Sequence, residues 1–240
     1  MNFMTVDKYY TDLIRRNLNN VPAFNELKNT LTQFQSLDFF IAGGAIRNLI
    51  SNTTEQMKDV DLFVNTLSQK SNQFERLQNL LSKKGTLEFG QYGSPRWFPN
   101  QMTSFYYDIV PFHKFDVGFG NPTSIDETLL QFDFTANAVG FNIYTNVLHN
   151  PIRGLEDSEN NILKAVRLDF PDEIISAQVP VPRLSVLWFR FMHYASKLDY
   201  VIEEETLLWI IQNSYRIKDL YLFEKYFFKP DIKEGLVSKL

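Results

Sequence analysis

The sequence predicts an α+β protein in which a unit that mixes helices and strands extends to about Val166 and an all-helical unit follows it. Short apolar runs and alternating patterns, both typical of strands, occur only in the first part. Beyond Pro182, apolar residues instead recur at helical spacing. At 240 residues, of which 44% are hydrophobic and 22% charged, the chain can bury a core of ordinary composition.

Composition and charge exclude several functional classes. The formal net charge of -4 gives no overall positive field that would attract nucleic acid. The chain has no cysteine, which excludes disulfides, thiolate zinc sites and thiol nucleophiles. No secretory signal is recognisable, and no segment has the roughly 18 consecutive apolar residues that span a bilayer. We therefore expect a soluble, cytoplasmic protein without a membrane partner.

The first unit is expected to begin with helices. Apolar residues recur at helical spacing between Tyr9 and Phe34, and Pro22 interrupts the pattern, which predicts two short amphipathic helices. The apolar run of residues 37–42 ends in two glycines, so we expect a strand, a tight turn and then a helix over residues 45–51.

Alternation and turn signals predict the later elements. Residues 59–65 alternate and predict a second strand, and residues 105–112 predict a third, in which Pro111 suits a strand end or edge. Between them, residues 74–84 have helical spacing and GQYGSPRWFPN, residues 90–100, is expected to be a loop. The remaining expected elements are a helix over residues 126–137, a hairpin of AVGFNIY and VLHNPI, and helices over residues 183–198 and 202–228.

Two aspartates in the second strand indicate a metal site. Residues i and i+2 of a strand project from the same face, so Asp59 and Asp61 present both carboxylates to one side. Two carboxylates on the same strand face at this spacing repel each other unless a cation lies between them. Mg²⁺ prefers oxygen ligands and binds through one or two carboxylates and substrate phosphates. The alternative is a strand face that is simply solvated.

The adjacent glycines indicate a phosphate site. Between a strand and a helix, Gly43 and Gly44 allow the backbone to approach phosphate oxygens because no Cβ is in the way. The alternative is a plain tight turn. Together with the aspartates, however, they predict a nucleoside triphosphate site, because that ligand needs both a phosphate cradle and a metal clamp.

These residues also carry a resemblance to a known family. AGGAIRNLI followed by KDVDLFV resembles the head-domain signature of the class II tRNA nucleotidyltransferases, which include bacterial CCA-adding enzymes and poly(A) polymerases. Further matches are DFTANAVGFN, NPIRGLEDSENNILKAV and KLDYVIEEETLLWI, so the resemblance extends from about Phe39 to Phe227. It implies a polymerase β-like head with a small mixed sheet and flanking helices, and a helical neck. The implied domains are an N-terminal helical extension (1–36), the head (37–166) and the neck (167–240).

The resemblance also implies roles for individual residues. Asp108 would be a third carboxylate that helps to activate the acceptor hydroxyl, although it could equally be an outward-facing strand residue. Asp133 and Asn137, at helical i and i+4, would support the nucleotide, or else form local capping bonds. The other implied roles are Mg²⁺ binding by Asp59 and Asp61, and triphosphate binding by Gly43, Gly44 and Arg47.

The implied reaction is template-independent transfer of a nucleoside monophosphate from a nucleoside triphosphate to a hydroxyl acceptor by two-metal catalysis. An RNA 3′ end, as in tRNA, is the expected acceptor, and a protein or small-molecule hydroxyl is the alternative. The family's tRNA-holding body and tail domains would begin where this chain ends. A partner protein or a homo-oligomer is expected to replace them.

The chain departs from the family pattern at three motifs. Where the family has VRD, this chain has Ile46-Arg47-Asn48, and where the family has RRDFT, both arginines before Asp133 are absent. The Asp and Arg of the family's EDxxR motif in the neck align with Leu184 and Leu187, whose side chains cannot hydrogen-bond a base edge. Arg183 and Arg190, nearby on the same helix, could contact a base or a phosphate, but a lone Arg on an amphipathic helix is more often solvated, and we expect that here. Arg96 and Trp97 in the expected loop could stack on a base. The departures leave a second hypothesis open, that of a catalytically degenerate binding or regulatory subunit.

Overall fold

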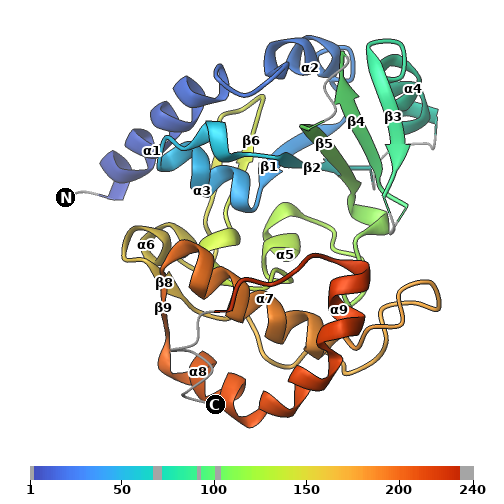
Figure 1. Cartoon of the computed structure of the whole chain (residues 1–240). Coiled ribbons are helices and arrows are strands. Elements are labelled where there is room, and N and C mark those ends of the chain that lie inside the picture. The colour runs from blue at the N-terminus through green and yellow to red at the C-terminus, as the bar shows by residue number, and fades with distance from the viewer. Residues whose placement is uncertain (1–2, 67–71, 91–92, 101–103, 233–240) are drawn as a thin grey trace. The chain divides into compact units, whose positions relative to one another are not determined.

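The computed structural model describes residues 3–66, 72–90, 93–100 and 104–232 (Figure 1). The chain divides into two compact units. The first comprises residues 1–116, 121–129 and 139–151, and the second comprises residues 117–120, 130–138 and 152–240. The domain boundaries after residues 36 and 166 stay predictions. In the described part of the chain, no helix combines the length and the apolar character that crossing a membrane requires.

Two amphipathic helices open the first unit, as predicted. They are α1 (Phe3–Leu18) and α2 (Phe24–Leu31), and Pro22 lies between them. Their apolar faces are buried, as at Ile14 and Leu27. Helix α3 (Gly44–Ile50) lies against α1, where the side-chain amide of Asn17 donates a hydrogen bond to the carbonyl oxygen of Leu49 at 2.6 Å.

A mixed sheet forms the centre of the first unit, and its strand order in the described residues is β3-β4-β5-β2-β1-β6-β7. Only β2 and β5 pair in parallel; the other neighbours are antiparallel. Helix α3 packs on β1 and β2, and α4 (Asn72–Leu81) packs on β3. The strands are β1 (Asp38–Ala42), β2 (Asp59–Asn65), β3 (Gly85–Phe89), β4 (Pro95–Pro99), β5 (Tyr106–Pro111), β6 (Gly140–Asn142) and β7 (Leu148–His149). Short helices η1 (Thr54–Gln56), η2 (Phe112–Lys114) and α5 (Ile125–Leu129) connect them.

The predicted loop over residues 90–100 is wrong, because β4 lies within it and pairs with β3, a strand that was not predicted. Burial alternates along β4, and Trp97 is fully buried, with its ring stacked 5.6 Å from that of Tyr107. Burial of every second side chain therefore outweighs the local Gly, Pro and Asn signals. Trp97 is consequently not available to stack on a base.

The predicted helix over residues 126–137 is also wrong, since α5 ends at Leu129 and a separate 3-10 helix, η3, spans Thr135–Asn137. The backbone here bonds elsewhere: the amide of Thr135 donates to the carbonyl oxygen of Lys164 at 2.8 Å, and Phe134 forms a bridge with Ala165. These long-range hydrogen bonds replace the i→i−4 bonds that would continue α5.

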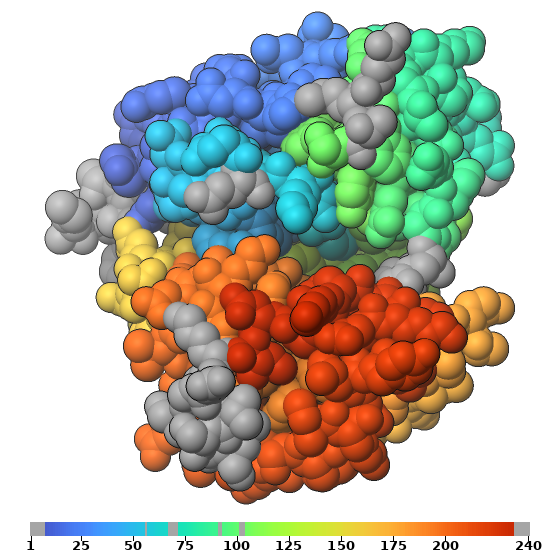
Figure 2. Space-filling view, viewed as in Figure 1, coloured from blue at the N-terminus to red at the C-terminus, as the bar shows by residue number. Residues whose placement is uncertain are grey.

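The second unit is mainly helical, but the prediction of an all-helical chain beyond Val166 is wrong. Strand β9 (Val201–Ile202) lies there and pairs in parallel with β8 (Ile162–Leu163). The expected helix over residues 202–228 is divided into three. The helices are α6 (Gly154–Glu159), α7 (Arg183–Leu198), α8 (Glu204–Gln212), η4 (Ser214–Asp219) and α9 (Leu220–Tyr226). Helices α8 and α9 contribute to the surface in Figure 2, although Phe223 of α9 is fully buried in the core of this unit with Trp188 and Phe189.

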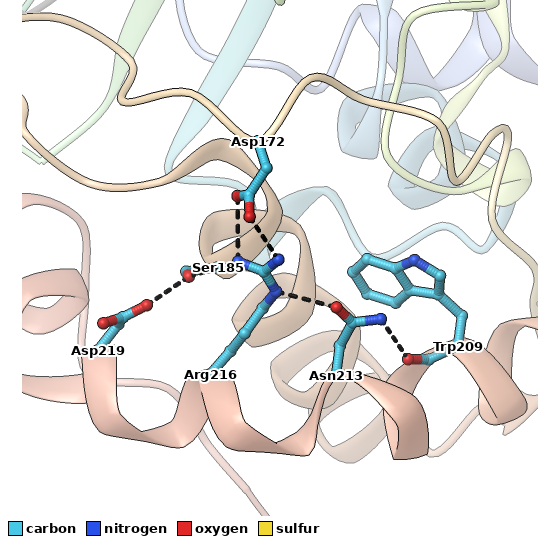
Figure 3. Close-up of polar contacts among 6 residues, drawn as sticks. All are labelled: Asp172, Ser185, Trp209, Asn213, Arg216 and Asp219. Carbon is cyan, nitrogen blue, oxygen red and sulfur yellow. Dashed lines mark hydrogen bonds and ion pairs between the residues drawn. The ribbon is translucent and has the colours of Figure 1, made fainter.

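A buried arginine in η4, Arg216, forms hydrogen bonds with residues elsewhere in the second unit (Figure 3). Arg216 is 3% exposed, and both of its terminal nitrogens donate to the carboxylate of Asp172, at 3.1 and 2.8 Å. Its other contacts are the hydroxyl oxygen of Ser185 at 3.2 Å and the side-chain oxygen of Asn213 at 3.1 Å. Because each guanidinium nitrogen has a partner, we assign this cluster to stability.

Candidate functional site

Asp59 and Asp61 lie on the same face of β2. Asp59 is exposed, Asp61 is half-buried, and Val60 between them points into the core at 1% exposure. The alternation read from the sequence is therefore present, and both carboxylates project from the side of the sheet opposite to Val60.

Asp108 lies directly beside Asp61. Strands β2 and β5 run parallel, with Asp61 opposite Asp108 in the register, so the two side chains project from the same face of neighbouring strands. One carboxylate oxygen of Asp108, Oδ2, accepts a hydrogen bond from Nε of Arg96 at 3.2 Å. The other, Oδ1, is buried and has no hydrogen-bond partner among the described residues. An unsatisfied buried carboxylate oxygen is costly unless something else binds it.

Tyr106 and Arg96 complete this surface, and the sequence analysis assigned neither to the site. Tyr106 lies opposite Asp59 in the register and its hydroxyl donates to Oδ2 of Asp59 at 3.2 Å. The Arg96 guanidinium lies 5.0 Å from the centre of the Tyr106 ring. Burial and the negative charge of Asp59 raise the pKa of Tyr106 to about 12, so its hydroxyl stays protonated at neutral pH.

Tyr106 could have been found from alternation. Tyr106 stands two residues before Asp108 on the strand that was predicted, so the two share a face. Arg96 was missed because its strand was interpreted as a loop.

The glycine bend begins beside the acids. Ala42, the last residue of β1, lies opposite Asp61, and Gly43 follows it directly. Gly43 has φ 77° and ψ −149°, a conformation that residues with a Cβ rarely adopt. Its amide donates to the carbonyl oxygen of Val139 at 3.3 Å, so this N–H is already occupied.

Arg47 folds back over Gly44. A Cβ on Gly44 would lie 3.2 Å from Nη2 of Arg47, so the absence of a side chain leaves room for the guanidinium. Gly44 and Arg47, two of the three residues expected to line a triphosphate site, are therefore neighbours next to the end of β1.

Asp133 and Asn137 belong to the second unit and are neighbours there. Oδ1 of Asp133 accepts from the Phe134 amide at 2.9 Å and from the Asn137 side-chain amide at 3.4 Å. Asp133 precedes η3, so the two residues are not at i and i+4 of one helix. Oδ2 of Asp133 is paired with Arg190 of α7 at 2.7 Å, and the expectation that Arg190 is solvated is therefore wrong.

Asp59, Asp61 and Asp108 could supply one or two carboxylate ligands to Mg²⁺, but they do not form a complete protein-only metal site. Within the described ranges, no group of three or more His, Asp or Glu side chains is placed to hold a metal ion. Mg²⁺, however, commonly takes only one or two protein carboxylates together with water and substrate phosphates. Asp59 and Asp61 on one face, with the unsatisfied oxygen of Asp108 on the next strand, match that requirement.

A protein-family comparison matches residues 12–158 to the model described as "Gabija anti-defense 2 family protein". The chain belongs to the Gabija anti-defense 2 family. The matched residues include Gly43, Arg47 and the three aspartates on β2 and β5. A comparison with curated proteins gives no match.

Solved structures show the fold of this Gabija anti-defense 2 family member. The Thermotoga maritima CCA-adding enzyme complexed with tRNA has a TM-score of 0.65 at 15% identity, and the match covers 94% of this chain and 52% of that enzyme. A CCA-adding enzyme with ATP gives 0.61 at 15% identity, with coverage of 89% and 47%. A tRNA nucleotidyltransferase with a primer tRNA and an ATP analogue gives 0.56 at 17% identity, with coverage of 83% and 60%.

These matches confirm the nucleotidyltransferase fold expected from the sequence. The chain spans about half the length of the CCA-adding enzymes it matches. The family model is that of Gabija anti-defense 2 and not of a poly(A) polymerase, so the expected family assignment is confirmed only at the level of the fold.

Proposed function

We propose that this family member is a Mg²⁺-dependent nucleotidyltransferase that moves a nucleoside monophosphate from a nucleoside triphosphate to a hydroxyl acceptor. One observation carries the proposal. The glycine bend, the paired aspartates and the third aspartate follow in order across adjacent strands β1, β2 and β5, with Ala42 opposite Asp61 and Asp61 opposite Asp108. Phosphoryl transfer needs this order, because the leaving pyrophosphate and the attacking hydroxyl lie on opposite sides of the reacting phosphorus.

The chain's own residues have separate tasks in this proposal. Asp59 and Asp61 would hold Mg²⁺, which supplies charge neutralisation at the phosphates. Arg47, folded over Gly44, would contact the triphosphate from the β1 side. Asp108 on the β5 side would accept the proton of the attacking hydroxyl through its unsatisfied oxygen.

An RNA 3′ end is the acceptor we propose first. Structural relatives include enzymes solved with tRNA. The family description adds a biological context: the transfer would act against the Gabija defence. Leu184 and Leu187 occupy the positions of the base-reading residues in the class II tRNA nucleotidyltransferase pattern. We therefore propose that any nucleotide selection uses other side chains.

The test is label transfer. The protein is incubated with Mg²⁺ and each α-labelled nucleoside triphosphate in turn, with RNA in one arm and protein extract in the other, beside Asp59→Asn and Asp61→Asn variants. Label that enters RNA and disappears in both variants supports the proposal. Label that enters only protein would show that the acceptor is a protein hydroxyl. Absence of Mg²⁺-dependent transfer in every arm overturns the proposal that the protein is an enzyme.

A binding module is the second candidate, and specific contacts favour it. The Gly43 amide is already bonded to Val139, and Arg96 already neutralises part of Asp108. A degenerate site of this kind would bind a nucleotide or a partner without turnover. Equilibrium binding of nucleoside triphosphate with and without Mg²⁺, measured beside the transfer assay, separates the two candidates.

A further inference from the structure

Tyr106 brings a hydroxyl group to the proposed site. It lies opposite Asp59 in the parallel register of β2 and β5, and its hydroxyl donates to Oδ2 of Asp59 at 3.2 Å. A hydroxyl acceptor must lie beside the carboxylates that would hold Mg²⁺, because the reacting phosphate would be bound there. The hydroxyl of Tyr106 already lies beside one of these carboxylates.

The ring of Tyr106 is held in place from two sides. The Phe98 ring lies 5.2 Å away, and the Arg96 guanidinium lies 5.0 Å from the Tyr106 ring centre while it also bonds to Asp108. These contacts restrict the ring to one orientation, with its hydroxyl at Asp59.

The strand order places this hydroxyl on the correct side. Tyr106 is on β5, the aspartates are on β2, and the glycine bend with Arg47 follows β1, on the opposite side of β2. Tyr106 and the bend with Arg47 therefore flank the aspartates of β2 from opposite sides. Nucleotidyl transfer requires the attacking hydroxyl and the leaving pyrophosphate on opposite sides of the α-phosphorus, and this order is compatible with that requirement.

We propose that Tyr106 is a self-modification site that accepts one nucleoside monophosphate from the bound nucleoside triphosphate. The inference rests on the proposed function, since it uses the same Asp59 and Asp61. The phenolic oxygen of Tyr106 forms a bond to the α-phosphorus as the bond between the α-phosphorus and the bridging oxygen breaks. Pyrophosphate leaves, the phenolic proton passes to solvent water, and the product is a tyrosyl phosphodiester.

The modification would inhibit the same site that catalyses it. The attached nucleotide occupies the position next to Asp59 that an external hydroxyl needs, so a modified chain is expected to lose transfer to other acceptors. Tyr106→Phe keeps the ring and its contacts with Phe98 and Arg96 but has no hydroxyl. It should therefore no longer inactivate itself during incubation with nucleoside triphosphate.

Intact-mass measurement of the full chain tests the proposal. The wild-type protein is incubated with Mg²⁺ and each of ATP, CTP, GTP and UTP, and then mapped by peptide mass spectrometry. We expect a gain of one nucleoside monophosphate at Tyr106, lost in Tyr106→Phe and in Asp61→Asn. Tyr221→Phe is the matched control, because Tyr221 is 79% exposed and its adduct would reveal non-specific chemistry.

Each outcome decides the question. An adduct that persists in Tyr106→Phe, or that maps to another residue, overturns the proposal. An unmodified wild-type chain that still transfers label to RNA or protein overturns self-modification and leaves the proposed function standing. Absence of both transfer and Mg²⁺-dependent triphosphate binding overturns the two together.

Discussion

Asp61 and Asp108 are register partners on the parallel strands β2 and β5, and one oxygen of Asp108 lacks a partner among the described residues. Two carboxylates on neighbouring strands of one face repel each other unless a cation compensates them. Arg96 compensates part of that charge through Oδ2 of Asp108. The proposed metal chemistry depends on the unsatisfied oxygen of Asp108 beside Asp61.

The first prediction concerns the acids themselves. Asp61→Asn should reduce Mg²⁺-dependent label transfer by about 100-fold or more, since removing one group that stabilises transition-state charge typically has effects of that order. Initial rates measure the effect, and thermal unfolding checks that the variant is folded. A rate within a few-fold of the wild type would contradict the assignment.

The second prediction concerns Arg96. Arg96→Ala leaves the carboxylate of Asp108, which is only 15% exposed, without its cation, and should destabilise the protein by about 1–3 kcal/mol. Added Mg²⁺ should recover part of that loss if the acids bind it. Urea unfolding with and without MgCl₂ tests this. Arg15→Ala is the control, because its pair with Asp12 is exposed and 3.7 Å long, and no change is expected there.

The third prediction separates the two glycines. Gly43→Ala should destabilise the fold by about 1–3 kcal/mol, because φ 77° with ψ −149° is unfavourable for a residue with a Cβ. Gly44→Ala should leave stability nearly unchanged but displace the Arg47 guanidinium, which a Cβ would meet at 3.2 Å. We expect the second variant to bind nucleoside triphosphate more weakly at unchanged melting temperature. Equal affinity in Gly44→Ala and wild type would remove Arg47 from the site.

The fourth prediction concerns the cluster in Figure 3. Asp172→Ala removes the carboxylate that holds both terminal nitrogens of buried Arg216 and should cost about 1–3 kcal/mol of unfolding free energy, because the Asp172 side chain is 45% exposed. Glu156→Ala is the control, because its partner Arg153 is 78% exposed, and it should change stability little. Denaturant unfolding followed by tryptophan fluorescence reports the difference. Similar losses in both variants would contradict a stabilising role for the cluster.

The fifth prediction concerns pH. Burial, with repulsion from Lys197, lowers the pKa of His193 from 6.5 to about 4, while Asp231 raises it and Arg190 lowers it slightly. Between these values the unfolded chain binds more protons than the folded one, so stability should be complete above about pH 6.5 and should fall as the pH drops towards 4. His193→Gln should flatten that dependence. Unfolding midpoints across pH 4–7 measure it, and an unchanged slope in the variant would assign the effect to other groups.

The sequence predicted the local elements most reliably where periodicity and burial agree. Helices α1, α2 and α7 and strands β1, β2 and β5 were all predicted, because their apolar residues recur at the period of the structure that buries them. Strand β4 was missed because its Gly, Pro and Asn neighbours are typical of loops, and only pairing with β3 and β5 reveals its buried face. The end of α5 was missed because the backbone at Thr135 bonds to Lys164, far along the chain.

The sequence by itself determined which residue types are available: two aspartates on one strand face, two glycines at a bend, and a third aspartate on a later strand. It also indicated the family resemblance that implied their chemistry. Only the tertiary structure decided that β5 lies beside β2 in parallel, so that Asp108 meets Asp61 and Tyr106 reaches Asp59. Which strands pair depends on residues far apart in the sequence and on which faces of the sheet are buried. No local pattern of residues specifies which strands become neighbours.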